Sequence, residues 1–228
     1  MNTDPVRRPT AEPHPRPHDL LFIAAARTVL ADGPLPAWAD RRWLDWAPAV
    51  VRRAAAPLPG IVPVGLRGRE RHQRFAAWLP ERDVATVVTP ESLSQARTWQ
   101  HYPDWRDFAP IQALERLAPR LEQRHCVWGV TGSVGFSIAS SLRVLNAGSD
   151  LDLLLRHPEP MSHAEARTLL QLTADLPCRS DIQVETPYGA FALLEWARAV
   201  PRVLLKTQDG PRLTPDPWTA PLDDGDSA

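Results

Sequence analysis

The stretch from Trp128 to Arg156, WGVTGSVGFSIASSLRVLNAGSDLDLLLR, constrains the fold of this chain more than any other part of it. A Gly-Ser pair follows one apolar run, and an Asp-x-Asp pattern later enters a second. Residues i and i+2 of a strand point to the same side, so Asp150 and Asp152 direct both carboxylates at one point. The leucines at 153–155 show no polar alternation, which predicts a strand covered on both faces.

Two carboxylates at an open strand end predict a site for a divalent cation. Hard cations such as Mg²⁺ take oxygen ligands and are usually held by one or two carboxylates plus substrate phosphates. The Gly132-Ser133 turn would bring backbone groups and a hydroxyl close to a phosphate tail. An Asp-x-Asp pattern alone is also typical of a solvated acidic strand end, and Gly-Ser alone is weak evidence. The two motifs in this order favour a metal-dependent phosphoryl or nucleotidyl transferase.

A third carboxylate is expected in the segment SDIQVET. Apolar and polar residues alternate there with a period of two, which places Asp181, Gln183 and Glu185 on one face of a strand. Asp181 is our candidate for a third metal ligand or a general base, because it lies at the start of the strand. Glu185 is the alternative, and an ordinary half-exposed strand is the other interpretation of the segment.

With these residues the chain resembles the nucleotidyltransferase superfamily, and further segments resemble one branch of it. The stretches TGSVGFSIASSLRVLNAGSDLDLLLR, AFALLEWAR, GPRLTPDPW and RPHDLLF together resemble the malonate decarboxylase holo-acyl-carrier-protein synthases, which are phosphoribosyl-dephospho-CoA transferases. The resemblance extends from about His18 to Trp218. The long gap between Gly132 and Asp150 favours this branch over relatives that modify antibiotics or tRNA.

The resemblance implies a definite reaction. The phosphoribosyl-dephospho-CoA group would pass from triphosphoribosyl-dephospho-CoA to a serine of the acyl-carrier subunit of malonate decarboxylase, with release of pyrophosphate. Asp150 and Asp152 would hold Mg²⁺ against the phosphates, and Asp181 would accept the serine proton. The alternatives are the equivalent modification of the citrate lyase carrier and a catalytically silent nucleotide-binding adaptor. An adaptor has no reason to keep a cluster of mutually repelling carboxylates, so the enzyme is favoured.

Two further basic features are candidates for phosphate binding. The segment RGRERHQRFAAWL combines four arginines with two aromatic residues, namely Arg67, Arg69, Arg71, Arg74, Phe75 and Trp78. Such a cluster suits a nucleotide or CoA phosphate, with Arg67 and Arg69 as our substrate-binding candidates, and the alternative is a solvated face over a packed tryptophan. Lys206, the only lysine, would reach the triphosphate or would simply be a solvated strand end.

Composition sets broad limits on location and partners. The formal net charge of −1 gives no bulk attraction to nucleic acid or membrane. The first 17 residues lack the apolar core of a signal peptide, and the apolar run 20–26 is far below the roughly 18 residues needed to span a bilayer. We therefore expect a cytoplasmic protein. Cys126 and Cys178 lack a zinc-like spacing and are expected to be free thiols.

Alternating strand and helix patterns predict the α/β (α+β) class. We expect a flexible arm over 1–17, a smaller N-terminal α+β substrate- and carrier-recognition domain over 18–92, a nucleotidyltransferase-like catalytic domain over 107–218 with a mixed sheet flanked by helices, and a disordered tail over 219–228. Helices are predicted over 20–30, 36–47, around 114–121, 162–175 and 190–199, and strands over 49–53, 61–66, 84–88, 126–130, 180–186 and 202–207.

Overall fold

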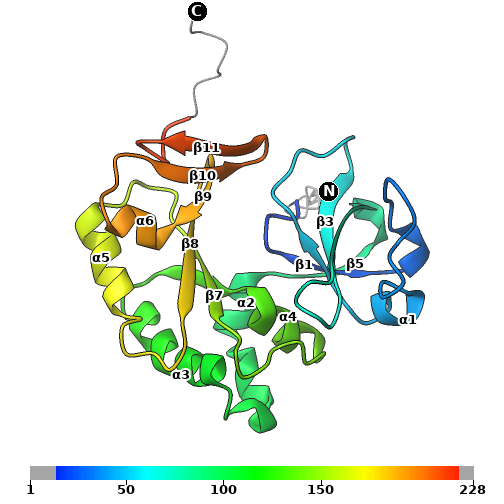
Figure 1. Cartoon of the computed structure of the whole chain (residues 1–228), viewed down its shortest axis with the longest axis horizontal. Helices are drawn as coiled ribbons and strands as arrows, with labels where there is room; N and C mark the ends of the chain where they lie inside the picture. The colour runs from blue at the N-terminus through cyan, green and yellow to red at the C-terminus, as the bar shows by residue number, and fades with distance from the viewer. Residues whose placement is uncertain (1–13, 221–228) are drawn as a thin grey trace, which may run out of the picture.

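A computed structural model describes residues 14–220, and the chain forms two β-sheets that stand beside each other (Figure 1). The arm predicted over 1–17 therefore lies outside the described residues up to position 13, and the predicted tail lies outside them from position 221. Residues 14–17 run along the N-terminal sheet, where His14 Nδ1 lies 3.0 Å from Glu81 Oε1. Within the described range, no helix is long and apolar enough to cross a membrane.

The N-terminal sheet has five antiparallel strands in the order β4-β3-β2-β1-β5. They are β1 (Leu20–Ile23), β2 (Ala49–Val51), β3 (Ile61–Arg67), β4 (Arg74–Pro80) and β5 (Val84–Val88). The predicted strands over 49–53, 61–66 and 84–88 are confirmed. The arginine-rich segment forms the turn of the β3–β4 hairpin and the strand ends beside it, with Arg67 opposite Arg74.

The predicted helix over 20–30 is wrong, because its first half is a central strand of this sheet. β1 pairs with both β2 and β5, and only a short 3₁₀ turn (Ala26–Thr28) follows it. A short apolar run fits a buried strand as well as a buried helix, and here the pairing on both sides decides. The helix predicted over 36–47 shrinks to α1 (Arg41–Leu44), which begins where the Asp40 side chain accepts a hydrogen bond from Trp43 N (2.8 Å).

The C-terminal sheet is mixed, with six strands in the order β11-β10-β9-β8-β7-β6 and one parallel pair, β7 with β8. The strands are β6 (Val127–Val130), β7 (Leu151–Arg156), β8 (Ser180–Thr186), β9 (Gly189–Ala192), β10 (Val203–Thr207) and β11 (Gly210–Thr214). Its helices are α2 (Pro90–Gln95), α3 (Ala109–Glu122), α4 (Gly132–Ser140), α5 (His163–Gln171) and α6 (Leu193–Ala197). The predicted mixed α/β class is confirmed.

Local signals explain where most of these helices begin. Thr89 caps α2 by accepting from Ser92 N (3.1 Å), and Ser162 caps α5 by accepting from Glu165 N (3.1 Å). Both caps supply an acceptor to a helix N–H that has no partner within the helix. The helix predicted over 190–199 starts late, at Leu193, because residues 189–192 pair as β9 with β8 and β10.

The helices divide between the two faces of the C-terminal sheet. α5 and α6 lie on the side of β8 that points away from the N-terminal sheet, whereas α2 and α4 lie between the two sheets (Figure 1). The apolar residues of β8, Ile182 and Val184, are buried in the core. The polar face of β8 therefore points toward the N-terminal sheet, which positions the site described next.

Candidate active site

Strand pairing brings two of the predicted carboxylates together. β7 and β8 run parallel with Asp152 opposite Asp181, so both side chains belong to one face of the sheet. Asp150 directly precedes β7. Asp152 and Asp150 are partly buried, while Asp181 is exposed at the start of β8. The alternation predicted for SDIQVET is observed in this strand, because its apolar residues are buried on the opposite face.

Gly132 of the Gly-Ser motif lies against Asp152 of the Asp-x-Asp motif. It opens α4 with a φ of +63°, a left-handed conformation that glycine adopts without strain. A Cβ at this position would lie 1.8 Å from Asp152 Oδ2. The chain thus needs glycine here for two reasons, backbone conformation and the close approach of the Asp152 carboxylate. The predicted turn is in fact the first turn of a helix.

The electrostatics of Asp152 reflect this crowding. Burial raises the pKa of the Asp152 carboxyl group, and the neighbouring carboxylates of Asp181 and Asp150 raise it further. Arg67 and Arg71 act in the opposite direction. A carboxylate among other carboxylates is stabilised in its charged form by a bound cation. The surroundings of Asp152 therefore suit cation binding.

The arginine cluster faces these carboxylates across a polar pocket of about 240 Å³. Among its lining residues are all four clustered arginines and four of the predicted site residues of the second domain, namely Arg67, Arg69, Arg71, Arg74, Gly132, Ser133, Asp150 and Asp152. The first N–H groups of a helix lack intrahelical partners and favour anions, and the first turn of α4 contributes Gly132 and Ser133 to the pocket. The pocket thus combines cations and helix N–H groups beside a carboxylate pair.

Arg67 is the buried member of the cluster, with 7% of its surface exposed. Burial lowers the pKa of its guanidinium to about 10, and the charge of Arg74 adds to this effect. At neutral pH it stays charged, and its Nε has no hydrogen-bond partner among the described residues. Trp43 Nε1 donates to the Arg67 carbonyl (2.7 Å) and so fixes the end of β3. A buried guanidinium with an unpartnered Nε can bind an anionic ligand.

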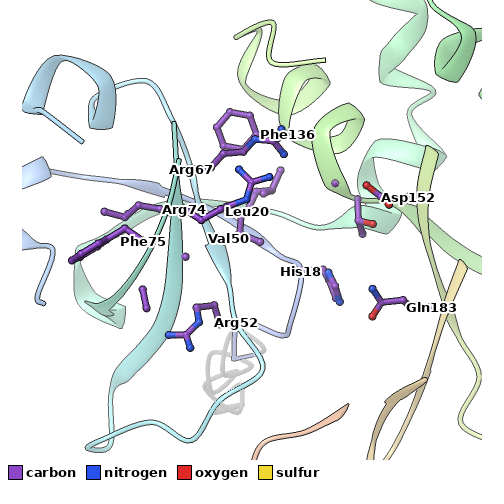
Figure 2. A pocket seen from close by; sticks show the side chains of 15 residues that line it. His18, Leu20, Val50, Arg52, Arg67, Arg74, Phe75, Phe136, Asp152 and Gln183 are labelled. Atoms are coloured by element: carbon purple, nitrogen blue, oxygen red, sulfur yellow. The ribbon is translucent and has the colours of Figure 1, made fainter. Parts of the chain in front are cut away.

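A larger and mostly apolar cavity of about 560 Å³ adjoins the polar pocket. The two share Arg67, Arg74, Gly132 and Asp152 as lining residues. Figure 2 shows side chains of the N-terminal sheet on one side, Asp152 and Gln183 of the C-terminal sheet on the other, and His18 between them. One site is therefore built by both domains.

His18 is a site residue that no motif in the sequence singles out. It takes a left-handed conformation (φ 76°) and lines the larger cavity. Burial lowers the pKa of its imidazole, although the charge of Glu185 acts against this. The only signal in the sequence was its place in the RPHDLLF segment.

Glu185, the alternative third carboxylate, is engaged elsewhere. It is buried, and its carboxylate pairs with Arg53 of the N-terminal domain. The same carboxylate lies 3.6 Å from His18 Nε2 and 3.7 Å from Arg156 Nη1. Arg156 Nε in turn donates to Glu91 Oε1 (2.6 Å). These charges join the two domains, and Glu185 lines neither pocket.

The donors present fit a cation held jointly by protein and substrate. Within residues 14–220, no three or more His, Cys, Asp or Glu side chains are arranged to hold a metal ion by themselves. Two neighbouring carboxylates opposite an arginine-lined pocket suit Mg²⁺, which is usually held by one or two carboxylates and keeps open positions for phosphate and water. Asp150 and Asp152 would supply these ligands, and Asp181 stays a predicted third.

Lys206 lies near His18, whose pKa is lowered by burial and further by nearby positive charges, that of Lys206 included. It is exposed on β10 opposite Ala190 and lines neither pocket. This position favours a solvated strand end over a contact with the triphosphate. The two cysteines are free, as expected.

Comparisons with known proteins agree over both domains. Residues 16–90 match the family described as phosphoribosyl-dephospho-CoA transferase MdcG N-terminal domain, and residues 92–217 match its C-terminal domain. A phosphoribosyl-dephospho-CoA transferase of Pseudomonas putida (strain GB-1) is 46% identical over 206 residues, which cover 90% of this chain and 96% of the relative.

Further relatives with the same description come from other bacteria. That of Azotobacter vinelandii is 44% identical over 208 residues, 90% of this chain and 94% of the relative. That of Klebsiella pneumoniae (strain 342) is 44% identical over 206 residues, 90% of this chain and 96% of the relative. No solved structure matches the chain. The resemblance seen in the sequence is confirmed, and the chain belongs to the phosphoribosyl-dephospho-CoA transferase family.

Proposed function

We propose that this enzyme transfers the phosphoribosyl-dephospho-CoA group of triphosphoribosyl-dephospho-CoA to a serine of the malonate decarboxylase acyl-carrier protein. The serine oxygen attacks the phosphorus next to the ribose, a new P–O bond forms, and the bond to pyrophosphate breaks. Family membership supports the reaction. The observation that carries the assignment of residues is that the carboxylate pair and the arginine cluster line one pocket.

The arginine cluster holds the leaving group in this proposal. Arg67, Arg69 and the first turn of α4 bind the triphosphate, because guanidinium groups and free helix N–H groups form charge-assisted hydrogen bonds to phosphate oxygens. The Arg69 guanidinium lies 4.5 Å from the centre of the Trp43 ring, a cation–π contact that restricts the position of this side chain. In phosphoryl transfer, such positioning and charge neutralisation carry most of the catalysis.

Asp150 and Asp152 hold Mg²⁺ in this proposal. When bound, the ion neutralises phosphate charge and orients the attacked phosphorus. Asp181 accepts the proton that the serine hydroxyl loses. Its exposed position at the start of β8 leaves it accessible to a serine presented by a separate carrier protein.

The choice of carrier is tested by mass spectrometry. The protein is incubated with Mg²⁺, triphosphoribosyl-dephospho-CoA and, in separate reactions, the carriers of malonate decarboxylase and citrate lyase. We expect the malonate decarboxylase carrier to gain the mass of the phosphoribosyl-dephospho-CoA group much faster. A carrier variant with the acceptor serine replaced by alanine is the matched control and should gain none. Faster modification of the citrate lyase carrier would contradict the proposal.

A further inference from the structure

The larger cavity has a floor formed by one straight row across the N-terminal sheet. Strand register places Leu20 opposite Val50, Val50 opposite Gly65, and Gly65 opposite Ala76, and all four line the cavity. Glycine and alanine leave the outer half of this row without a bulky side chain. The row is therefore flat and apolar, a surface suited to a planar ring.

Cations lie on both sides of this row, along the direction of the strands. Two residues after Gly65 on β3, Arg67 lies opposite Arg74 of β4, and both arginines line the polar pocket. Two residues before Gly65, Arg52 N donates to the Pro63 carbonyl (2.9 Å), so Arg52 belongs to the next row on the same face. At about 3.4 Å per residue, the four residues between the two arginine rows span roughly 14 Å. Figure 2 shows Arg52 at the end of the cavity opposite Arg67.

The far cation is available to a ligand. Arg52 is exposed, lines the cavity and forms no ion pair within the described part of the chain. Across from the floor, Gln183 presents an amide that can both donate and accept hydrogen bonds. The cavity thus fits a ligand with an apolar ring system, hydrogen-bonding groups on one edge and negative charge at both ends.

We propose that this cavity binds the adenosine of the dephospho-CoA moiety, with Arg52 on the diphosphate that leads to pantetheine. The inference rests on the proposed function, because the substrate of that reaction carries its adenosine between two phosphate groups. The triphosphate end enters the polar pocket, and the attacked phosphorus lies where the two pockets meet, beside Asp152 and Gly132. The N-terminal domain is then a nucleoside-binding domain.

Ala76→Leu tests the floor, because leucine would cover it from the edge strand β4. The matched control is Ala85→Leu, an exposed alanine on the other edge strand, β5, outside the cavity. Isothermal titration calorimetry measures binding of dephospho-CoA and of inorganic tripolyphosphate. We expect Ala76→Leu to weaken dephospho-CoA binding at least about tenfold and to leave tripolyphosphate binding within about twofold, and Ala85→Leu to change neither. Circular dichroism establishes that each variant is folded.

Gly65→Val is a second variant that keeps the proposal testable should Ala76→Leu unfold. A Cβ at Gly65 meets only ordinary contacts, the nearest being Arg52 Cγ at 3.5 Å.

Arg52→Ala tests the far cation. It should weaken dephospho-CoA binding about tenfold while adenosine binding stays unchanged.

Three results would overturn the proposal: no binding of dephospho-CoA to the unmodified protein, undiminished binding to folded floor variants, or equal effects of Arg52→Ala on adenosine and dephospho-CoA. Transfer to the carrier by the unmodified protein is measured in parallel. Intact transfer together with unaffected binding in the variants would refute this subsite alone. Absent transfer would refute the proposed function, whichever way the binding results fall.

Discussion

Replacing Gly132 with alanine should separate catalysis from folding. The new Cβ would lie 1.8 Å from Asp152 Oδ2, whereas ordinary contact begins at 3.4 Å. The Asp152 carboxylate must then move by about 1.6 Å, and a displacement of about 1 Å at a reacting centre can cost about 100-fold in rate. The positive φ of +63° adds backbone strain of about 1–2 kcal/mol. We therefore expect transfer to fall at least about 100-fold in a protein that still folds.

Gly60→Ala is the matched control for this variant. Gly60 has a similar φ of +74°, but its Cβ would meet nothing within 4 Å. Gly60→Ala should lose about 1–2 kcal/mol of unfolding free energy in urea titrations, and Gly132→Ala should lose at least as much, because its Cβ also displaces Asp152. Only Gly132→Ala should lose transfer, measured as the mass gain of the carrier in single-turnover reactions. Normal transfer by Gly132→Ala, or an equal loss in Gly60→Ala, would refute the argument that the Gly132–Asp152 contact matters for catalysis.

Three further outcomes follow from the site. Asp181→Asn should slow transfer while leaving calorimetric binding of dephospho-CoA unchanged, and a normal single-turnover rate would remove Asp181 as the base. Glu185→Ala leaves Arg53 and its other cationic neighbours without their shared anion. Urea titration should therefore show a loss of about 3 kcal/mol or more of unfolding free energy. A loss below about 1 kcal/mol would mean that the interdomain ion pairs contribute little to stability. The double change Arg69→Ala and Arg71→Ala should weaken tripolyphosphate binding in a salt-dependent way but not adenosine binding, and unchanged tripolyphosphate affinity would identify the cluster as a solvated face.

Local motifs indicated which residues of the C-terminal domain lie close together. The Gly-Ser pair and the Asp-x-Asp pattern are close in sequence, and a strand–helix–strand arrangement brings them together, with Gly132 against Asp152. The period of two in β8 correctly placed Asp181 on a polar face, because one face of that strand is buried. Such short-range patterns report directly on local structure.

The contribution of the N-terminal domain was not predictable in the same way. The placement of Arg67 opposite the carboxylates depends on how two sheets pack, and no local pattern encodes that. The strand pattern makes Glu185 a candidate ligand, but Glu185 pairs with Arg53, which lies 132 positions away in the sequence. An apolar run does not reveal its partners, so the pattern predicts a helix where β1 lies. For the same reason it gives no sign of the cavity floor, to which Leu20 of β1 contributes. Long-range contacts decided each of these features.

We propose that both domains form one site for phosphoryl transfer, with Asp152 beside the attacked phosphorus. This proposal is tested most directly by measuring carrier mass gain and pyrophosphate release together in single-turnover reactions with Mg²⁺, for the unmodified protein and for Asp152→Ala and Asp150→Ala. We expect the unmodified protein to release one pyrophosphate for each carrier that it modifies. Each folded variant should form both products at least about 100-fold more slowly. Near-normal turnover in both variants, or mass gain without pyrophosphate, would contradict the proposal.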